Sequence, residues 1–392
     1  MLFFILFGTM FVLGFVESMK GVSYPIIKTE FAISYEQQGM MVSIISLSFV
    51  LFCFVAGIIQ GSFGAKRALH VGFITMILGM IGIFLPPVLG LPRFLSVAAF
   101  FILAASFGLL EVSTNALAAQ LFTSRAALLM SLLNFFYGVG SSFSPIAAGA
   151  ITAAADWRTA YLLCIPLALI FFVPSVFFRF HEEEAGAGKE KRPGFFTAMQ
   201  TPMVWVFSVV LGLMIGVEVC SVNWAGVYFQ DVYNLDPKSS GAAFLSHFYI
   251  FFTISRLVGG FAIEKIGYLK SLFIGTLAAL IILILGFAFG AKGIYILPFI
   301  GFFVAIFWPT ILATAMGYFR KDAPIMTSAI IVISGALNSV IQYLIGLTNR
   351  LAGPEWGYRS SIFYAVLIIA MLVVLSKRIK QPYRSGGRTA PE

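Results

Sequence analysis

The sequence predicts an all-α integral membrane protein, with twelve transmembrane helices in two pseudo-symmetric six-helix bundles. Three observations support this prediction. Apolar and aromatic residues make up 60% of the 392-residue chain, and charged residues only 10%, against roughly 25% in soluble domains. Twelve segments are long and apolar enough to cross a bilayer, and features of the first half recur in the second. A soluble protein of this size is therefore excluded.

The twelve segments are expected to be helices, because backbone polar groups cannot stay unpaired in lipid. A helix that crosses about 30 Å of hydrocarbon needs about 20 mostly apolar residues. The predicted spans are 3–24, 39–60, 68–89, 94–120, 127–153, 159–178, 203–229, 241–263, 269–290, 294–318, 325–349 and 358–376. The first run lacks a basic leader region and a small-residue cleavage site, so we interpret it as a span and not as a signal peptide.

The distribution of lysine and arginine predicts the orientation. With a cytoplasmic N-terminus, sixteen basic residues fall on the cytoplasmic side and seven on the other, as the positive-inside rule requires. We expect a multi-pass protein of the inner (plasma) membrane, with both termini cytoplasmic, surrounded by the lipid bilayer and monomeric. The net charge of +9 does not indicate nucleic-acid binding, because the basic residues are spread between apolar runs and form no patch.

A long polar connector divides the chain into two halves. Residues 181–200 contain HEEEAGAGKEKRPG, a composition typical of a solvated linker. It separates an N-terminal bundle, residues 1–180, from a C-terminal bundle, residues 201–380, which is followed by a cytoplasmic tail, residues 381–392.

Two glycine-rich loops occupy equivalent places in the two halves. Gly57 and Gly64 lie seven residues apart after the second span, and Gly260 and Gly267 lie seven apart after the eighth, each pair followed by basic residues. A parallel repeat of six helices is the arrangement of major facilitator transporters. The sequence therefore predicts a pseudo-two-fold relation between the halves.

An acidic residue of the second loop suggests a cytoplasmic gate. Glu264 lies at the inner end of span eight, where glycines allow helices to approach closely. We expect it to pair with Arg320 or Lys321 after span ten when the cavity is closed on that side. Arg256, near the inner end of the same span, is assigned to this gating region. The alternative is that these charges only set the topology.

Ionisable groups inside the spans mark the candidate site, because burying one in lipid costs about 3 kcal/mol or more. Glu17 and Lys20 lie on one face of span one and are expected to form an ion pair toward a central cavity. The candidates for ion coupling are Glu111, Glu17 and Lys20. The candidates for substrate binding are Glu111, Asn115, Asn134, Tyr137, Glu218, Trp224, Trp308, Asn338 and Gln342.

Aromatic rings beside carboxylates and amides suit a sugar, whose C–H face packs on a ring while its hydroxyls form hydrogen bonds. The same mixture would accept an amphipathic drug. The three cysteines and three histidines show no metal-ligand spacing, so we expect no metal and no cofactor beyond a coupling ion, either a proton or sodium. No spacing of nucleophile and base suggests an enzyme.

Short motifs in both halves resemble those of the fucose–galactose–glucose:proton symporters. They are Glu111-Val-Ser-Thr-Asn115, Asn134-Phe-Phe-Tyr-Gly138-Val-Gly140, Gly216-Val-Glu218 with Trp224, Ser255-Arg256-Leu-Val-Gly259, and Trp308-Pro309-Thr310-Ile311. The resemblance implies a major facilitator fold and uptake of a hexose with a proton. It also implies that Glu111 corresponds to that family's span-four glutamate, which binds both the substrate and the coupling proton.

One position departs from the family's pattern. The family has a proton-carrying aspartate four residues before the proline of span one. Here Pro25 is present, but that position is Gly21. Either Glu17 takes over the coupling role, or the coupling differs, to sodium or to no ion.

The sequence thus predicts a secondary active transporter that moves a monosaccharide by alternating access, as a proton symporter. The alternatives are a sodium-coupled or uncoupled sugar transporter and an efflux pump for amphipathic compounds. The amides of Asn115, Asn134, Asn338 and Gln342 argue against efflux. A membrane receptor that binds the solute without moving it is left open.

Overall fold

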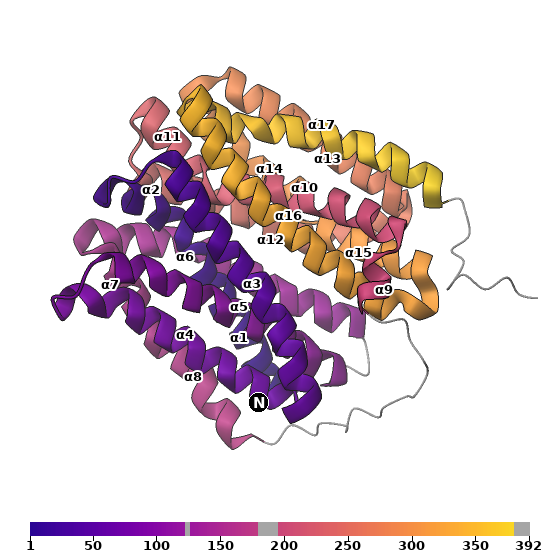
Figure 1. Ribbon diagram of the computed structural model, residues 1–392, viewed down its shortest axis with the longest axis horizontal. Coiled ribbons are helices and arrows are strands. Elements are labelled where there is room, and N and C mark those ends of the chain that lie inside the picture. Colours follow the sequence, from indigo (N-terminus) through magenta and orange to yellow (C-terminus); the bar gives the residue numbers. More distant parts are fainter. Residues whose placement is uncertain (122–125, 179–194, 380–392) are drawn as a thin grey trace, which may run out of the picture.

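The computed structural model describes residues 1–121, 126–178 and 195–379. Within these ranges every regular element is helical. The predicted tail and residues 181–194 of the predicted linker lie outside the described residues. Figure 1 shows two bundles of helices, formed by the first and second halves of the chain, that lie side by side.

The N-terminal bundle contains helices α1 to α8. Their bounds are α1 (Leu2–Ser18), α2 (Lys20–Glu30), α3 (Tyr35–Phe63), α4 (Ala65–Val88), α5 (Phe94–Leu121), α6 (Ala126–Ala154), α7 (Trp157–Leu162) and α8 (Cys164–Phe177).

The C-terminal half begins with the short helix α9 (Phe195–Met199) and contains six further spans. Its elements are α10 (Pro202–Asn223), α11 (Ala225–Tyr233), the π-helical turn η1 (Pro237–Gly241), α12 (Ala242–Ile266), α13 (Tyr268–Ala288), the 3₁₀ turns η2 (Gly290–Tyr295) and η3 (Leu297–Phe299), α14 (Ile300–Val304), α15 (Phe307–Phe319), the 3₁₀ turn η4 (Arg320–Asp322), α16 (Ala323–Ala352) and α17 (Pro354–Ile379).

Each predicted span coincides with one helix or with short helices in sequence. The first is α1 continued by α2, and the seventh is α10 continued by α11. In the described ranges eleven spans meet the length and hydropathy expected of a membrane helix, and α6 occupies the fifth predicted segment. Exposed phenylalanine, leucine and isoleucine side chains cover the outside of the bundle. The predicted all-α, twelve-span fold is confirmed.

The repeat between the halves extends to the backbone of the two glycine-rich loops. Gly64 joins α3 to α4 with φ +88°, and Gly267 joins α12 to α13 with φ +91°. This conformation is open to glycine because it lacks a Cβ. The two glycines therefore make the same tight turn between consecutive spans.

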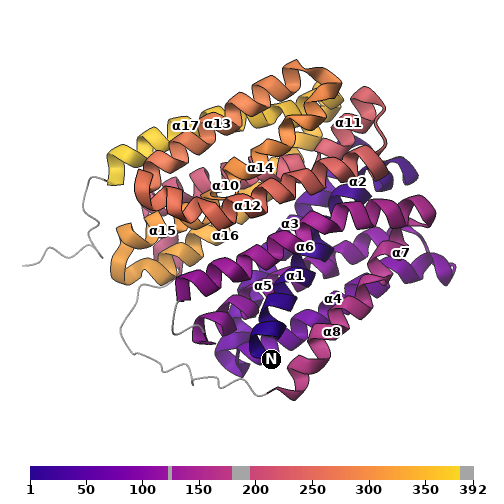
Figure 2. The same cartoon turned by 180° about the vertical axis from the view of Figure 1, so that it is seen from behind.

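The halves pack mainly through two pairs of helices, α3 against α16 and α6 against α12, and α2 adds contacts with α11. Figures 1 and 2 show these pairs from opposite sides. Small residues lie where the helices cross. A Cβ on Gly39 would be 2.9 Å from the Gly346 Cα, and one on Gly149 would be 2.9 Å from the Ala242 Cβ. The close approach at both crossings therefore depends on the absence of side chains.

Candidate functional site

A cavity of about 220 Å³, lined by charged and amide side chains among apolar ones, lies between the two halves. Its walls come from α1, α2, α3, α5, α6 and α7 on one side and from α10, α12, α15 and α16 on the other. Nine of the predicted functional residues line it: Glu17, Lys20, Glu111, Asn134, Tyr137, Glu218, Arg256, Trp308 and Asn338. Residues far apart in the sequence are thus gathered into one site.

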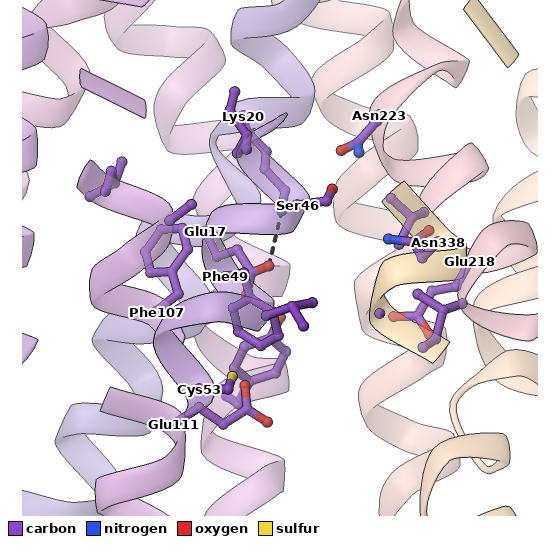
Figure 3. Close-up of a pocket in the computed structure, with 18 of the residues that line it drawn as sticks. Glu17, Lys20, Ser46, Phe49, Cys53, Phe107, Glu111, Glu218, Asn223 and Asn338 are labelled. Atoms are coloured by element: carbon purple, nitrogen blue, oxygen red, sulfur yellow. Dashed lines mark hydrogen bonds and ion pairs between the residues drawn. The ribbon is translucent and has the colours of Figure 1, made fainter. Parts of the chain in front are cut away.

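The ion pair expected between Glu17 and Lys20 is present in the N-terminal wall. Lys20 Nζ donates to Glu17 Oε1 over 2.9 Å, and Tyr137 of α6 donates its hydroxyl to Glu17 Oε2, also over 2.9 Å. Figure 3 shows the pair facing the cavity. The two side chains are only 20% and 18% exposed, so removing one partner would leave a buried, uncompensated charge.

Two carboxylates, Glu111 on α5 and Glu218 on α10, face the cavity from opposite halves (Figure 3). Neither side chain has a hydrogen-bond or ion-pair partner among the described residues. Because a buried charge needs a partner, these groups are suited to bind a proton or to accept hydrogen bonds from substrate hydroxyls. Asn115, one turn from Glu111, does not line the cavity; its amide donates to the Glu111 backbone carbonyl over 2.9 Å.

Asn338 is supported from behind by two residues that sequence analysis placed in the binding site itself. Gln342 Nε2 donates to Asn338 Oδ1 over 3.2 Å, and Trp224 Nε1 donates to Gln342 Oε1 over 2.9 Å. Both Trp224 and Gln342 are buried and lie outside the cavity lining. Their contacts fix the orientation of the Asn338 amide, which is the one of these three side chains that lines the cavity.

Arg256 is placed in the cavity, whereas sequence analysis assigned it to the cytoplasmic gate. Its Nη1 donates to Asn134 Oδ1 over 3.2 Å, a contact between α12 and α6. The guanidinium lies 4.5 Å from the centroid of the Phe252 ring. The side chain therefore belongs to the interface of the two halves at the level of the site.

Sequence analysis missed Asn223, which is 2% exposed and lines the cavity with an unpaired carbonyl oxygen. Asn223 lies four residues after Val219 and eight after Ile215, and both of these also line the cavity. This helical register was the available signal. Within the same segment, the charge of Glu218 and the indole of Trp224 are stronger signals than an amide.

Gly21, which replaces the aspartate of the family's pattern, lies at a contact between the halves. A Cβ at this position would be 2.7 Å from the Val222 backbone oxygen and 2.6 Å from Leu245 Cδ1. A larger side chain has no room here in this conformation. The nearest acid of α1 that reaches the cavity is Glu17.

Polar contacts join the halves at the end where α2 meets α11. Lys28 pairs with Asp231 at 3.0 Å, and Tyr35 donates to the same carboxylate over 2.9 Å. Glu36, next in sequence, pairs with Arg350. The start of α3 is therefore attached to both α11 and α16.

Toward the opposite ends of α3 and α12, glycines lack close neighbours. Gly57 and Gly61 on α3 and Gly260 on α12 have no atom within 4 Å of the position of a Cβ. Glu264 and Arg320 are exposed, and they form no ion pair with each other in the described structure. The predicted gate between them stays a prediction, since it is expected only when this end is closed. No cluster of potential metal ligands occurs among the described residues.

Twelve spans around a central cavity lined with ionisable groups, with the halves joined at one end, define a membrane transport protein. The chain belongs to the Major Facilitator Superfamily, whose family model matches residues 6–343. It is therefore a multi-pass membrane transporter and not an enzyme.

Known relatives confirm the resemblance that the motifs indicated. A Brucella abortus protein named glucose/galactose transporter is 24% identical over 85% of this chain and 84% of its own. A Helicobacter pylori protein, whose name also refers to glucose and galactose transport, is 24% identical over 91% of this chain and 90% of its own.

Solved structures share the fold. The crystal structure of the transporter FucP in its outward conformation matches with a TM-score of 0.69 at 16% identity, covering 97% of this chain and 98% of FucP. A POT family transporter in complex with 5-aminolevulinic acid matches with a TM-score of 0.76 at 14% identity, covering 96% of each chain.

Proposed function

We propose that this protein carries a monosaccharide across the inner membrane together with a proton, as a monomer with cytoplasmic termini. The observation that carries the proposal is the unpartnered Glu111 carboxylate in a cavity that also offers amides and an indole ring. The names of the Brucella and Helicobacter relatives support a hexose as the solute.

The cavity residues divide between the solute and the coupling ion. Asn338, Asn134 and Glu218 offer hydrogen bonds to sugar hydroxyls, and Trp308 offers an apolar face. Glu111 takes the coupling proton. In a poorly solvated site, the proton affinity of a carboxylate depends strongly on the charges and hydrogen bonds around it. Glu17 is held by Lys20 and Tyr137 and serves as the fixed electrostatic partner of this site.

The places where the halves touch support alternating access. Their polar contacts lie at the end with α2 and α11, which we assign to the extracellular side from the loop charges. This conformation thus faces the cytoplasm. Rocking of the halves would open the end with α2 and α11 and bring Glu264 toward Arg320.

The test is transport in proteoliposomes that contain the purified protein. Labelled glucose, galactose and fucose are offered with an imposed proton gradient, a sodium gradient or none. We expect accumulation with the proton gradient alone, and counterflow without any gradient. Accumulation driven by the sodium gradient would show that sodium, and not a proton, is the coupling ion. Binding without counterflow would indicate a receptor.

The Glu111→Gln variant tests the assigned coupling residue. The amide cannot cycle a proton, so gradient-driven accumulation should be lost, whereas counterflow should persist because an amide still forms hydrogen bonds with hydroxyls. Normal accumulation by this variant would exclude Glu111 as the coupling group. Export of amphipathic dyes, with no sugar counterflow by the native protein, would favour the efflux alternative.

A further inference from the structure

Gln38 is a buried amide without a partner, near the end where the halves are joined. It is the fourth residue of α3 and is fully buried. Neither its Oε1 nor its Nε2 has a hydrogen-bond partner among the described residues. It does not line the central cavity, so the proposed sugar site does not account for it.

Other buried amides of the C-terminal half have partners. Gln342 Nε2 donates to Asn338 Oδ1 over 3.2 Å, and Asn349 Oδ1 accepts the backbone N–H of Gly357 over 2.7 Å. Burial of an amide is costly when no hydrogen bond replaces those it makes to water. Gln38 therefore makes this conformation less stable than an apolar side chain of the same size would.

The helical register places Gln38 between the two halves. Ile45 and Phe49, seven and eleven residues further along α3, line the cavity, and Val42 on the same face is buried. At 1.5 Å per residue, Gln38 lies about 10 Å from Ile45 along the helix, toward the end where α2 meets α11. Gly39, the next residue, lies where α3 crosses α16 (Figure 1). Separation of the halves at this end would thus expose Gln38.

We propose that Gln38 opposes closure of the extracellular end, because its amide is buried without a partner in this conformation and gains hydrogen bonds to water or to a solute hydroxyl when that end opens. The proposal rests on the alternating access proposed above, and not on the identity of the solute. It makes Gln38 a conformational counterweight on the entry path.

The counterweight acts against contacts that favour closure. The Lys28–Asp231 ion pair and the close crossing at Gly39 both hold this end together. One buried polar group without a partner shifts such an equilibrium by about tenfold toward the open form. This effect is similar in size to that of an ion pair between the halves. The end can therefore close in each cycle and still reopen.

The experiment replaces the amide by an apolar group of the same length, in Gln38→Met. Opening is followed through a cysteine at Ala242, which is buried at the other crossing, between α12 and α6. With the native cysteines replaced and no sugar present, labelling of Ala242→Cys should slow by about tenfold when Gln38→Met is added. The Tm in detergent should rise, because a buried group without a partner has been removed.

The matched control is Gln37→Met, the same substitution at the preceding residue. Gln37 is exposed, and its Oε1 accepts the Ser34 backbone N–H over 2.8 Å as part of the cap of α3. Loss of this bond should lower the Tm and leave labelling of Ala242→Cys unchanged. The two neighbouring glutamines are thus expected to change stability in opposite directions.

Asp231→Asn shows whether the assay reports opening, since it removes an ion pair between the halves. Faster labelling in Asp231→Asn with native labelling in Gln38→Met would overturn this proposal and leave alternating access intact. Native labelling in both variants would contradict alternating access as well. A lower Tm in Gln38→Met would show that the amide stabilises this conformation, contrary to the proposal. If Gln38→Met does not insert, Gln38→Leu replaces it, and failure of both to insert equally overturns the proposal.

Discussion

Lys28 of the N-terminal half and Asp231 of the C-terminal half form an ion pair 3.0 Å long, with side chains only 18% and 16% exposed. Tyr35 donates its hydroxyl to the same carboxylate oxygen, and the Lys28 ammonium lies 4.4 Å from the centroid of the Tyr35 ring. Three side chains thus stabilise one another at a contact that joins the two halves at this end.

Asp231→Asn should shift the population toward the conformation that is open at this end. A partly buried pair between the halves contributes about 1 kcal/mol, which corresponds to about a fivefold change in the equilibrium. Ala242 is buried where α12 crosses α6, so a cysteine there is labelled when this end opens. With the native cysteines replaced, labelling of Ala242→Cys should increase by that factor. The control is Glu355→Gln, which breaks an ion pair within α17 and should leave labelling unchanged. Equal labelling in the two variants would show that the Asp231 pair has no gating role.

The Glu17–Lys20 pair should behave as a unit in a double-mutant cycle. Lys20→Met leaves the Glu17 carboxylate with only the Tyr137 hydroxyl, and an unpaired buried charge costs several kcal/mol, about 3 or more. Adding Glu17→Gln removes that charge, so the double variant should be more stable than Lys20→Met alone. Thermal unfolding in detergent gives the measurement. A double variant less stable than the sum of the single changes would indicate separate roles.

The helices, and most of the charged residues that line the cavity, could be predicted from the sequence because two strong signals coincide. Apolar runs of membrane length define the spans, and a charge within such a run, as at Glu111 or Glu218, faces the protein interior. The glycine-rich loops gave the repeat, because Gly64 and Gly267 require the same unusual backbone conformation.

What the sequence could not show depends on contacts between distant residues. Trp224 and Gln342 carry polar groups and lie in spans, as Asn338 does, yet they bond to each other and lie outside the cavity lining. The pairing of Lys28 with Asp231 joins segments about half a chain apart, and no local pattern specifies it. Arg256 was placed at the wrong level because its partner, Asn134, lies on a helix of the other half.

Gln342→Met tests whether the residues behind Asn338 act by orienting it. The substitution keeps the side-chain length but removes both hydrogen bonds, so the Asn338 amide is free to rotate and the Trp224 indole N–H is left unpaired. Sugar affinity should fall by about tenfold, the effect of losing one or two hydrogen bonds. Adding Trp224→Phe should restore stability, since no donor is then left without an acceptor, but not affinity. Unchanged affinity in Gln342→Met would mean that Asn338 does not contact the sugar.

Gly39→Val should arrest the transporter with the α2–α11 end open. A Cβ at Gly39 would lie 2.9 Å from the Gly346 Cα and 3.1 Å from the Gln342 backbone oxygen. These are backbone atoms of α16, which cannot move aside as a flexible side chain would, so α3 and α16 could not cross this closely. In the opposite conformation the two helices separate at this end and the valine is accommodated.

The Gly39→Val protein should therefore insert and bind sugar from the extracellular side, while transport is lost and Ala242→Cys is labelled almost completely. Gly57→Val is the matched control on the same helix, because no atom lies within 4 Å of the Gly57 Cβ position in this conformation. The Gly57→Val protein should therefore transport sugar at the native rate. Normal transport by Gly39→Val would show that closure does not require the close crossing of α3 and α16.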